Sequence, residues 1–558
     1  MGIIVFLIFS LSILGCIQCQ SDFSETDDDE PDNLDDGVMT KSGKIVGKIT
    51  QFYGVLTRAY LGVPYAKAPV GDLRFKKPQP IEPWSDTLVA DTMPPACVQY
   101  SKTYVPWYDD DRQSEDCLYM NIWSPRNVYV NRNLSVMLWI HGGEFTVGSN
   151  KLPATNGQGL SLFGASLVVA PNYRLGAMGF LSSGTEDAPG NMGIHDIIMA
   201  LKWIRENIAA FKGDPDRITI FGQGSGAVTV SMFLMSPLTQ GLYQRAILQS
   251  GAFFSNKPDP NEYNLDMGQK LAVAVDCASE NQTLRDNPKE VVDCLRDVDP
   301  TTLAVTLSSF NPTVPKSFLP IYGDDFLPKS PAKYLKTGQF HDVDIIIGVN
   351  KQEGSYLLVT EYPEIFGDSG DAKIAIPKSF GQTILRRMFK DLKDPEEIVD
   401  QYLGELDEQD TDEVKKQVYT AMGDYSVTCP SLYFAEQYNT GNNSVKFYVF
   451  DQRPSDTQWA KWMGTTHYDE VAMVFARPID GYDYDSFTTS FTPEMAVSFT
   501  VSHMWGKFAD LGVTDSYWKP FTKYHHQYVL ISMKGKRKMS GPGPHLDNCN
   551  FFRKHFGV

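Results

Sequence analysis

The stretch at residues 218–227, Ile-Thr-Ile-Phe-Gly-Gln-Gly-Ser-Gly-Ala, joins a short apolar strand to a glycine-dense turn. The apolar, periodic segment at 228–235 predicts a helix directly after it. This is the layout of a nucleophile elbow, in which a Gly-x-Ser-x-Gly turn lifts a serine above a β-sheet. Gly222 and Gly226 occupy the two glycine positions, but the residue between them is Gly224, and the serine stands one place later, at Ser225.

Short apolar segments alternate with helical ones along most of the chain. Residues 46–60 alternate around a Tyr53-Gly54 turn, and residues 251–318 are helical and loop-rich. The pattern predicts buried strands at 117–123, 136–140, 167–171, 214–220, 343–348 and 445–450, and helices at 192–210 and 498–511. We therefore predict an α/β fold with a large, mostly parallel central sheet, flanked by helices and carrying helical insertions.

The N-terminus predicts an export signal followed by an acidic tail. Residues 3–14 form an apolar run that is too short for a membrane span and typical of a secretory signal peptide. Residues 22–36 contain nine acidic residues and no basic residue, a composition typical of a solvated, disordered segment. We expect a signal peptide at 1–19, a disordered acidic segment at 20–40 and one folded domain at 41–558, in a secreted protein.

The charge of the chain excludes some classes of partner. The formal net charge is −18, and so acidic a chain binds nucleic acid poorly. A short basic run at 534–538 does not reverse this expectation. No later segment is long and apolar enough for a transmembrane anchor. We expect neither a metal ion nor a cofactor.

The cysteines indicate disulfide bonds. Once Cys16 and Cys19 leave with the signal, six remain: Cys97, Cys117, Cys277, Cys294, Cys429 and Cys549. An even number in an exported chain indicates disulfides, although the residues alone leave many pairings open. Sequons at Asn133, Asn281 and Asn442 are consistent with glycosylation during export.

Several motifs together resemble the cholinesterase and type-B carboxylesterase family. The resemblance covers residues 47–551, nearly the whole mature chain. The matching segments are GVPYA at 62–66, PVGDLRF at 69–75, EDCLY at 115–119, APGN at 188–191, GDP at 213–215, GVNKQEGS at 348–355 and GTTH at 464–467. Any one of these motifs would be weak, but the set is highly specific.

The resemblance implies the α/β-hydrolase fold and a triad in the chain order nucleophile, acid, base. By motif, the acid is Glu353 and the base is His467. Glu353 follows a buried strand within a glycine-bounded turn, from which its carboxylate could hold the imidazole in one tautomer. The resemblance also implies the disulfides Cys97–Cys117, Cys277–Cys294 and Cys429–Cys549.

The nucleophile position of the implied triad is Gly224, which has no side chain to acylate. Removing the triad serine of a hydrolase costs on the order of 10⁶ in turnover. Ser225 could substitute only if the turn deformed, because the next residue of a helix is rotated by about 100°. We expect its Oγ to point away from His467 and its backbone N–H to belong to the oxyanion hole.

Two further positions of the implied site depart from the family. The resemblance assigns further oxyanion donors to the N–H groups of Gly143 and the following residue, which is small in active relatives and is Glu144 here. A carboxylate beside a forming oxyanion would repel it by several kcal/mol in a dry site; the alternative is that Glu144 swings outward. Gln223 stands where the family usually carries glutamate, which removes a negative charge.

One ligand-binding feature of cholinesterases is retained. Trp107 lies ten residues before Cys117, at the place of the tryptophan that holds the choline ammonium in that subfamily, and Tyr356 matches another aromatic of the same site. A tryptophan face attracts quaternary ammonium by about 1–2 kcal/mol. The alternative is that Trp107 is ordinary loop packing.

Two functional hypotheses follow. In the first, the chain is a secreted, non-catalytic binding protein for an extracellular protein partner or a choline-like ligand, as with neuroligins, the adhesion proteins of the same family whose sites lack the serine. In the second, it is an active carboxylic-ester hydrolase that uses Ser225, or a water activated by His467 and Glu353.

Overall fold

The computed structural model describes residues 34–556, except for 103–104, 110, 127–131, 254–258, 311–317, 373, 440–442, 482–491, 534–538 and 541–542. The expected signal peptide, most of the acidic segment, the Asn442 sequon and the basic run at 534–538 lie outside the described residues.

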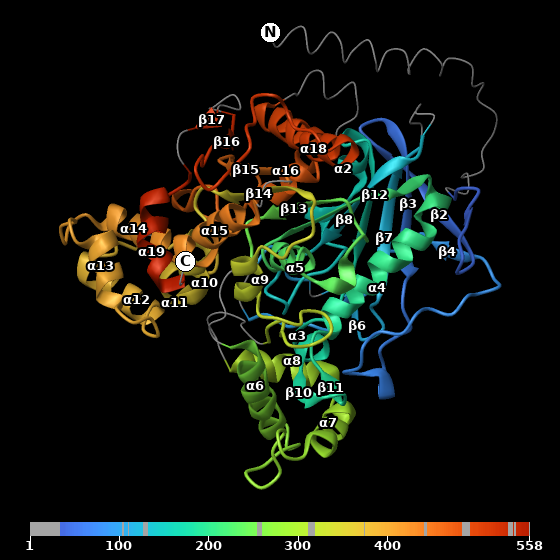
Figure 1. Ribbon diagram of the computed structural model, residues 1–558, viewed down its shortest axis with the longest axis horizontal. Coiled ribbons are helices and arrows are strands. Elements are labelled where there is room, and N and C mark those ends of the chain that lie inside the picture. The colour runs from blue at the N-terminus through green and yellow to red at the C-terminus, as the bar shows by residue number, and fades with distance from the viewer. Residues whose placement is uncertain are drawn as a thin grey trace. The chain divides into compact units, whose positions relative to one another are not determined.

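A single mixed sheet organises the described part of the chain (Figure 1). It has 13 strands: β1 Val38–Met39, β2 Lys44–Phe52, β3 Val55–Pro64, β4 Leu88–Ala90, β7 Tyr119–Pro125, β8 Leu134–Ile140, β9 Ser166–Pro171, β12 Gly213–Gln223, β13 Arg245–Gln249, β14 Asp344–Asn350, β15 Val445–Phe450, β16 Tyr528–Ile531 and β17 Met539–Ser540. Two small two-stranded sheets pair β5 Ala96–Cys97 with β6 Gln113–Ser114, and β10 Ser182–Thr185 with β11 Ala188–Pro189.

The strand order confirms the predicted α/β class. The order is β1-β2-β3-β7-β9-β8-β12-β13-β14-β15-β16-β17, with β4 beside β2. From β9 to β16 all neighbours are parallel, whereas β2, β3 and β7 pair in antiparallel fashion at one side. Strands β8 and β9 are buried at every residue, which explains why they are continuous apolar runs rather than alternating ones.

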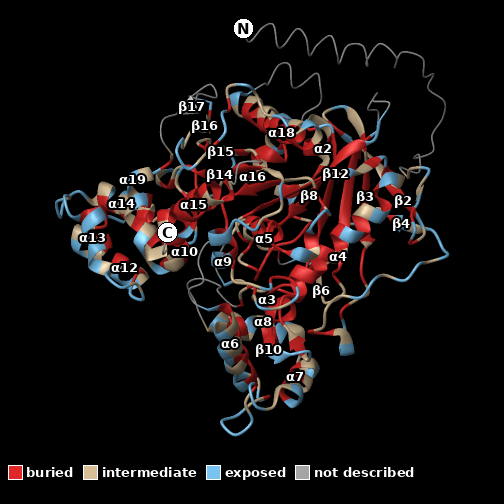
Figure 2. Cartoon of the chain, in the orientation of Figure 1, coloured by how far each residue is buried: buried red, intermediate tan, exposed pale blue. Residues whose placement is uncertain are grey.

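Helices cover the sheet on both sides. The α-helices are α2 Gln158–Phe163, α3 Gly176–Phe180, α4 Met192–Asn207, α5 Ser225–Phe233, α6 Pro260–Ala274, α7 Pro288–Asp297, α8 Pro300–Ser309, α9 Pro331–Thr337, α10 Ser355–Glu361, α11 Pro363–Phe366, α12 Lys378–Met388, α13 Pro395–Leu403, α14 Thr411–Gly423, α15 Cys429–Tyr438, α16 Asp469–Val474, α18 Pro493–Leu511 and α19 Leu546–Phe556. In Figure 1, α18 and α2 lie above the central strands and α4 and α5 below them. Helix α18 packs on α16, α2 and β8, and α5 packs on β12 and β13, so the central strands are buried from both sides (Figure 2).

Many of these helices begin with a proline at their first position, where its missing N–H costs nothing. Three of them are also capped by the preceding side chain: Asp259 accepts from the N–H of Asn261, Asp299 from Thr302, and Thr492 from Met495. Such caps satisfy backbone donors that the first turn leaves unpaired. The helical insertions after β13 are thus specified locally by sequence.

The folded domain begins earlier than expected. Strand β1 pairs with β2 inside the segment 20–40 that we expected to be disordered. The Asp35 carboxylate accepts hydrogen bonds from the N–H groups of Gly37 and Gly47 and from the Tyr60 hydroxyl. These donors stabilise the Asp35 carboxylate at the end of the acidic run. The compact unit starts at Asp35, six residues before the expected boundary at 41.

Among the described residues, three disulfides join Cys97 to Cys117, Cys277 to Cys294 and Cys429 to Cys549. These are the pairs that the family resemblance implies. The first two close loops of 20 and 17 residues, whereas the third spans 120 residues and ties α15 to the C-terminal helix α19.

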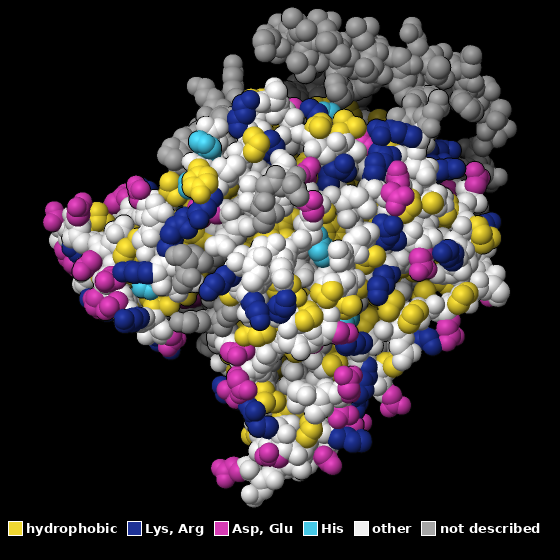
Figure 3. Space-filling view, in the orientation of Figure 1, with side chains coloured by type: hydrophobic (Ala, Val, Ile, Leu, Met, Phe, Trp, Pro, Cys, Tyr) yellow, Lys and Arg dark blue, Asp and Glu magenta, His cyan; other side chains and the backbone are white. Residues whose placement is uncertain are grey.

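The surface is acidic in one conspicuous region. Asp and Glu side chains gather over α13 and α14 at the left of Figure 3, where the exposed residues include Glu396, Glu397, Glu405, Asp407 and Glu408. A membrane-spanning helix is not found in the described part of the chain, since none of its helices is both long and apolar enough.

Candidate functional site

The turn between β12 and α5 has the geometry of a nucleophile elbow. Gly224 adopts φ 56° and ψ −122°, in the region that favours glycine. The strand and helix approach so closely that a Cβ at Gly226 would lie 2.0 Å from the carbonyl oxygen of Ile140. A Cβ at Gly222 would lie 2.6 Å from the carbonyl carbon of Gly226. These two glycines are therefore required by the packing of the turn.

Glu353 and His467 meet next to this turn. Glu353 follows β14, and His467 lies in the loop before α16. The two loops are tied together by a parallel bridge between Gln352 and Thr466 and by a 2.7 Å hydrogen bond from the Asn350 side chain to the Thr466 carbonyl. Glu353 Oε2 lies 2.7 Å from His467 Nδ1, and its other oxygen accepts the Asn350 N–H at 2.6 Å. The carboxylate thus holds the proton on Nδ1, which leaves Nε2 as an acceptor.

Gly224 is the third member of this cluster. A Cβ at Gly224 would lie 3.1 Å from His467 Nε2, so a serine there would face the imidazole. Ser225 is turned elsewhere: its Oγ is buried and lies beside the hydroxyl of Tyr173. Within the described residues, no hydrogen bond joins Ser225 to His467.

Gln223 takes the place at His467 that a nucleophile would use. Its amide nitrogen lies 2.9 Å from His467 Nε2, and because an amide NH₂ can only donate, the ring nitrogen accepts. The amide oxygen lies toward the loop after β8, where a Cβ at Gly142 would approach it to 2.9 Å. The sequence identified Gln223 only as a lost charge. Its position directly before Gly224, on the strand that ends at the imidazole, is the signal that could have revealed this contact.

Opposing effects act on the charge of His467. Burial alone would lower the pKa of the imidazole, but the charge and hydrogen bond of Glu353, with smaller contributions from Glu470 and Glu144, raise it above its ordinary value. A paired, cation-stabilising environment of this kind is what a general base requires.

The loop after β8 lies against the elbow because β8 and β12 are neighbours, with Ile140 opposite Gly222. Gly143 and Glu144 both have positive φ values, 105° and 55°, and the turn is closed by hydrogen bonds from Thr146 and Val147 to the Gly143 carbonyl. Glu144 is half-buried. Its charge raises the pKa values of both Tyr356 and His467, so the carboxylate does act electrostatically on this site.

Three aromatic rings form a cluster at His467. Tyr356 stacks on the imidazole with ring centroids 4.8 Å apart, and Trp107 meets Tyr356 at 5.7 Å and His467 at 6.0 Å. Tyr468 completes the cluster, 5.1 Å from Trp107. The sequence predicted Trp107 and Tyr356 but missed Tyr468, although it directly follows His467. The fold thus brings residues from three distant segments into one aromatic cluster.

Glu470 is a second buried carboxylate that the sequence did not identify. It accepts from the side chains of Asn350 at 2.6 Å and Gln249 at 3.3 Å. Burial and the neighbouring charge of Glu353 raise the pKa of Glu470 to about 7. Asn350 therefore connects the two carboxylates: its side chain donates to Glu470 and its backbone N–H donates to Glu353.

Two of the three predicted glycosylation sites lie among the described residues. Asn133 and Asn281 are exposed, as glycosylation would require.

A mostly parallel sheet with an elbow after β12, an acid after β14 and a histidine in a later loop defines a protein of the α/β-hydrolase fold. The chain belongs to the carboxylesterase family, whose family model matches residues 35–551. It is 36% identical to Acetylcholinesterase-1 of Trittame loki, with 93% of this chain and 94% of that protein covered. It is 34% identical to Cholinesterase of Mus musculus, with 93% of this chain and 86% of that protein covered. It is 32% identical to Acetylcholinesterase of Leptinotarsa decemlineata, with 92% of this chain and 85% of that protein covered.

Proposed function

We propose that this protein is a secreted, non-acylating member of the family that binds a choline-like cation at the aromatic cluster of Trp107, Tyr356 and Tyr468. The observation that carries the proposal is the position of Gly224: the place facing His467 Nε2 has no side chain, so no covalent ester intermediate can form there.

The arrangement of Gln223 supports the same conclusion. Its amide donates to Nε2, the atom that would have to accept a proton from an attacking hydroxyl or water. The amide also extends toward Gly142, and so it occupies the space between the imidazole and the loop that would hold a scissile carbonyl. A water-only mechanism would have to displace this side chain first.

Charge and ring composition support a cationic ligand. Electron-rich rings attract quaternary ammonium groups, and the carboxylate of Glu144 acts on the ring cluster through its effect on Tyr356. Glu144 thus replaces the negative charge that Gln223 removes.

Export is supported by the disulfides, which persist in oxidising compartments.

Ester hydrolysis is the second candidate. It is favoured by the intact contact between Glu353 and His467 and by relatives whose names include acetylcholinesterase and cholinesterase. It would use Ser225 or an activated water as nucleophile. A protein partner, as for the adhesion members of the family, stays a prediction.

Two measurements separate the candidates. Purified protein treated with a nitrophenyl ester should give no burst of nitrophenol, and an organophosphate should leave it unlabelled. A stoichiometric label on Ser225 would establish the hydrolase and contradict our proposal.

Binding is tested directly by calorimetry with a quaternary ammonium ligand and its uncharged tert-butyl isostere. We expect only the cation to bind, and Trp107→Ala to abolish its binding. The control is Trp84→Ala, because the Trp84 indole donates to Lys44 on β2 instead. Equal binding of the neutral isostere, or an unchanged affinity of Trp107→Ala, would exclude cation recognition by this ring.

A further inference from the structure

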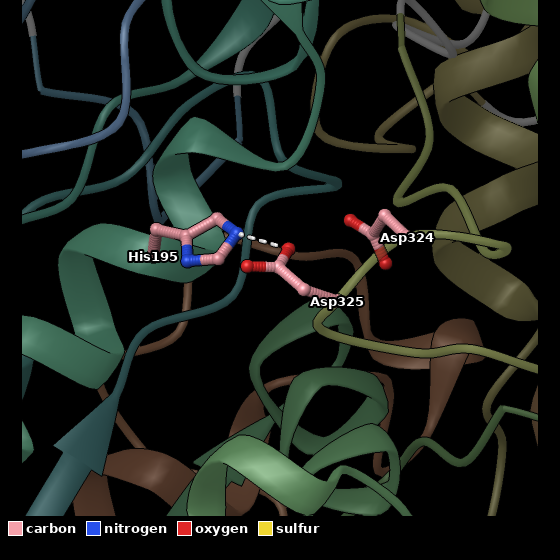
Figure 4. Close-up of side chains that lie close together, drawn as sticks. All are labelled: His195, Asp324 and Asp325. Carbon is pink, nitrogen blue, oxygen red and sulfur yellow. Dashed lines mark ion pairs between the residues drawn. The ribbon is translucent and has the colours of Figure 1, made fainter.

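A histidine and two aspartates converge away from the candidate active site (Figure 4). His195 lies on α4, and Asp324 and Asp325 lie in the loop before α9. One ligand atom of each residue lies within 4.8 Å of the other two. His195 Nε2 and Asp325 Oδ1 are 3.7 Å apart, beyond hydrogen-bond distance.

His195 Nε2 makes no hydrogen bond among the described residues, and its contact with Asp325 is an ion pair at 3.7 Å. The residue is only 8% exposed, and this nitrogen is buried. Buried polar atoms are almost always satisfied by protein, water or an ion. In Figure 4 the ring edge carrying Nε2 points at Asp325 and toward the Asp324 loop.

The carboxylate of Asp324 is already held in place. One oxygen accepts from the side chain of Asn191 at 2.8 Å, and the other from the backbone N–H of Leu327 at 2.8 Å. The Asn191 amide also bonds both backbone groups of Ile321, at 2.9 and 3.0 Å. Outer hydrogen bonds of this kind orient the carboxylates of metal sites.

Lys77 provides the positive charge of the cluster in this structure. Its ammonium lies 2.8 and 2.9 Å from the two oxygens of Asp325. The Lys77 side chain is 37% exposed, so its ammonium can swing into solvent. A bound cation would replace Lys77 as the partner of Asp325.

We propose that His195 Nε2 and carboxylate oxygens of Asp324 and Asp325 form a binding site for a divalent transition-metal ion of the zinc class. Two ligands about 2 Å from a tetrahedral ion lie roughly 3.3 Å apart. The 3.7 Å separation of His195 and Asp325 needs only a small closure, and the three ligand atoms, which lie within 4.8 Å of one another, need a closure of at most about 1.5 Å. An imidazole nitrogen favours zinc over magnesium or calcium, which prefer oxygen alone. The ion would fasten the loop that carries Asp324 to α4.

The test is titration of the purified, untagged protein with Zn²⁺ by calorimetry, and with Co²⁺ by visible absorption. We expect one ion per chain and a higher melting temperature with Zn²⁺. His195→Leu and Asp325→Asn should each weaken binding by about 10–100-fold. Lys77→Gln should strengthen it, because the competing ammonium is gone.

The matched control is His525→Leu, at an exposed histidine outside the cluster. Its affinity for Zn²⁺ should equal that of the unmodified protein. Asp325 is exposed, so Asp325→Asn tests the site even where His195→Leu fails to fold. The proposal is overturned if Asp325→Asn binds Zn²⁺ as tightly as the unmodified protein, if Lys77→Gln binds no Zn²⁺, or if Mg²⁺ binds more tightly than Zn²⁺.

Discussion

Around position 224, single substitutions can test whether the protein binds a ligand or hydrolyses an ester. Gly224→Ser would place an Oγ beside His467 Nε2, but Gln223 already donates to that nitrogen, and the Glu144 carboxylate acts electrostatically on the same site. We expect Gly224→Ser alone to restore little hydrolysis of a nitrophenyl ester. Gly224→Ser with Glu144→Gly should be faster than the single variant by about 10²–10³, the usual effect of one oxyanion interaction.

The control for this pair is Glu144→Gly alone, which should show no burst, because members of one catalytic unit are not additive. Labelling by an organophosphate should appear only in chains that carry the new serine. If the single and double variants have equal rates, Glu144 does not oppose the oxyanion.

Glu470 predicts a pH-dependent stability. Its folded pKa of about 7 lies above the ordinary 4.5, so the folded state binds its proton more tightly than the unfolded state does. The stability that this proton contributes is complete below about pH 4.5 and is lost as the pH rises through 7. Glu470→Gln carries no charge at any pH, although its NH₂ must face one of the two amide donors that the carboxylate accepts from. Its free energy of unfolding, relative to that of the unmodified protein, should therefore rise by roughly 2–3 kcal/mol between pH 5 and pH 8.

The difference in melting temperature between Glu470→Gln and the unmodified protein should therefore change with pH, in favour of the variant as the pH rises from 5 to 8. Glu405→Gln, at an exposed acid in the loop after α13, serves as the control and should change the melting temperature at neither pH. A difference between Glu470→Gln and the unmodified protein that is independent of pH would mean that Glu470 is not the titrating group.

At the scale of elements, the junction of β8, β12 and α5 is the most constrained part of the fold. Gly226→Ala raises helix propensity, yet its Cβ would lie 2.0 Å from the Ile140 carbonyl oxygen, so α5 must move. We expect a loss of 3 kcal/mol or more, beyond the roughly 1–3 kcal/mol of ordinary overpacking, measured by denaturant unfolding. Gly241→Ala is the control, because its Cβ would contact nothing within 4 Å; its positive φ should cost only about 1–2 kcal/mol.

The elements themselves were largely predictable. Apolar runs at 136–140 and 167–171 correspond to β8 and β9, and periodicity placed α4 and α18, although α18 starts five residues earlier than the predicted 498, at its capped proline Pro493. Strand β13 was not predicted, because its five residues begin with Arg245 and end with Gln249. Both polar side chains are used in tertiary contacts, Arg245 with the carbonyl of Ala509 and Gln249 with Trp505.

At the scale of the whole molecule, the long disulfide should matter most. Cys429–Cys549 spans 120 residues and Cys277–Cys294 only 17. In the chain-entropy model such loops contribute about 5 and 3 kcal/mol. Calorimetry should therefore show a larger fall in melting temperature for Cys429→Ser/Cys549→Ser than for Cys277→Ser/Cys294→Ser. The reverse order would mean that local packing outweighs loop length.

The candidate site was less predictable than the fold. Sequence motifs identified Glu353, His467 and Trp107 as candidate site residues, but hydrogen bonds between distant segments cannot be deduced from the spacing of residues along the chain. The contact between Gln223 and His467 depends on how β12 and the loop before α16 meet, and the cluster of His195 with Asp324 depends on the clamp by Asn191. These contacts are set by the packed tertiary structure.

The backbone of Gly224 has a consequence for how such a protein could change over evolutionary time. A serine held at φ 56° and ψ −122° would carry conformational strain on the order of 1–3 kcal/mol, which glycine avoids. This relief exceeds the roughly 0.5–1 kcal/mol that glycine's greater unfolded freedom costs. A lineage that exchanges the serine for glycine therefore gains folding stability as it loses the nucleophile for ester hydrolysis. The reverse substitution, Gly224→Ser, destabilises the fold before any gain in activity can be selected, so the loss of the serine is hard to reverse.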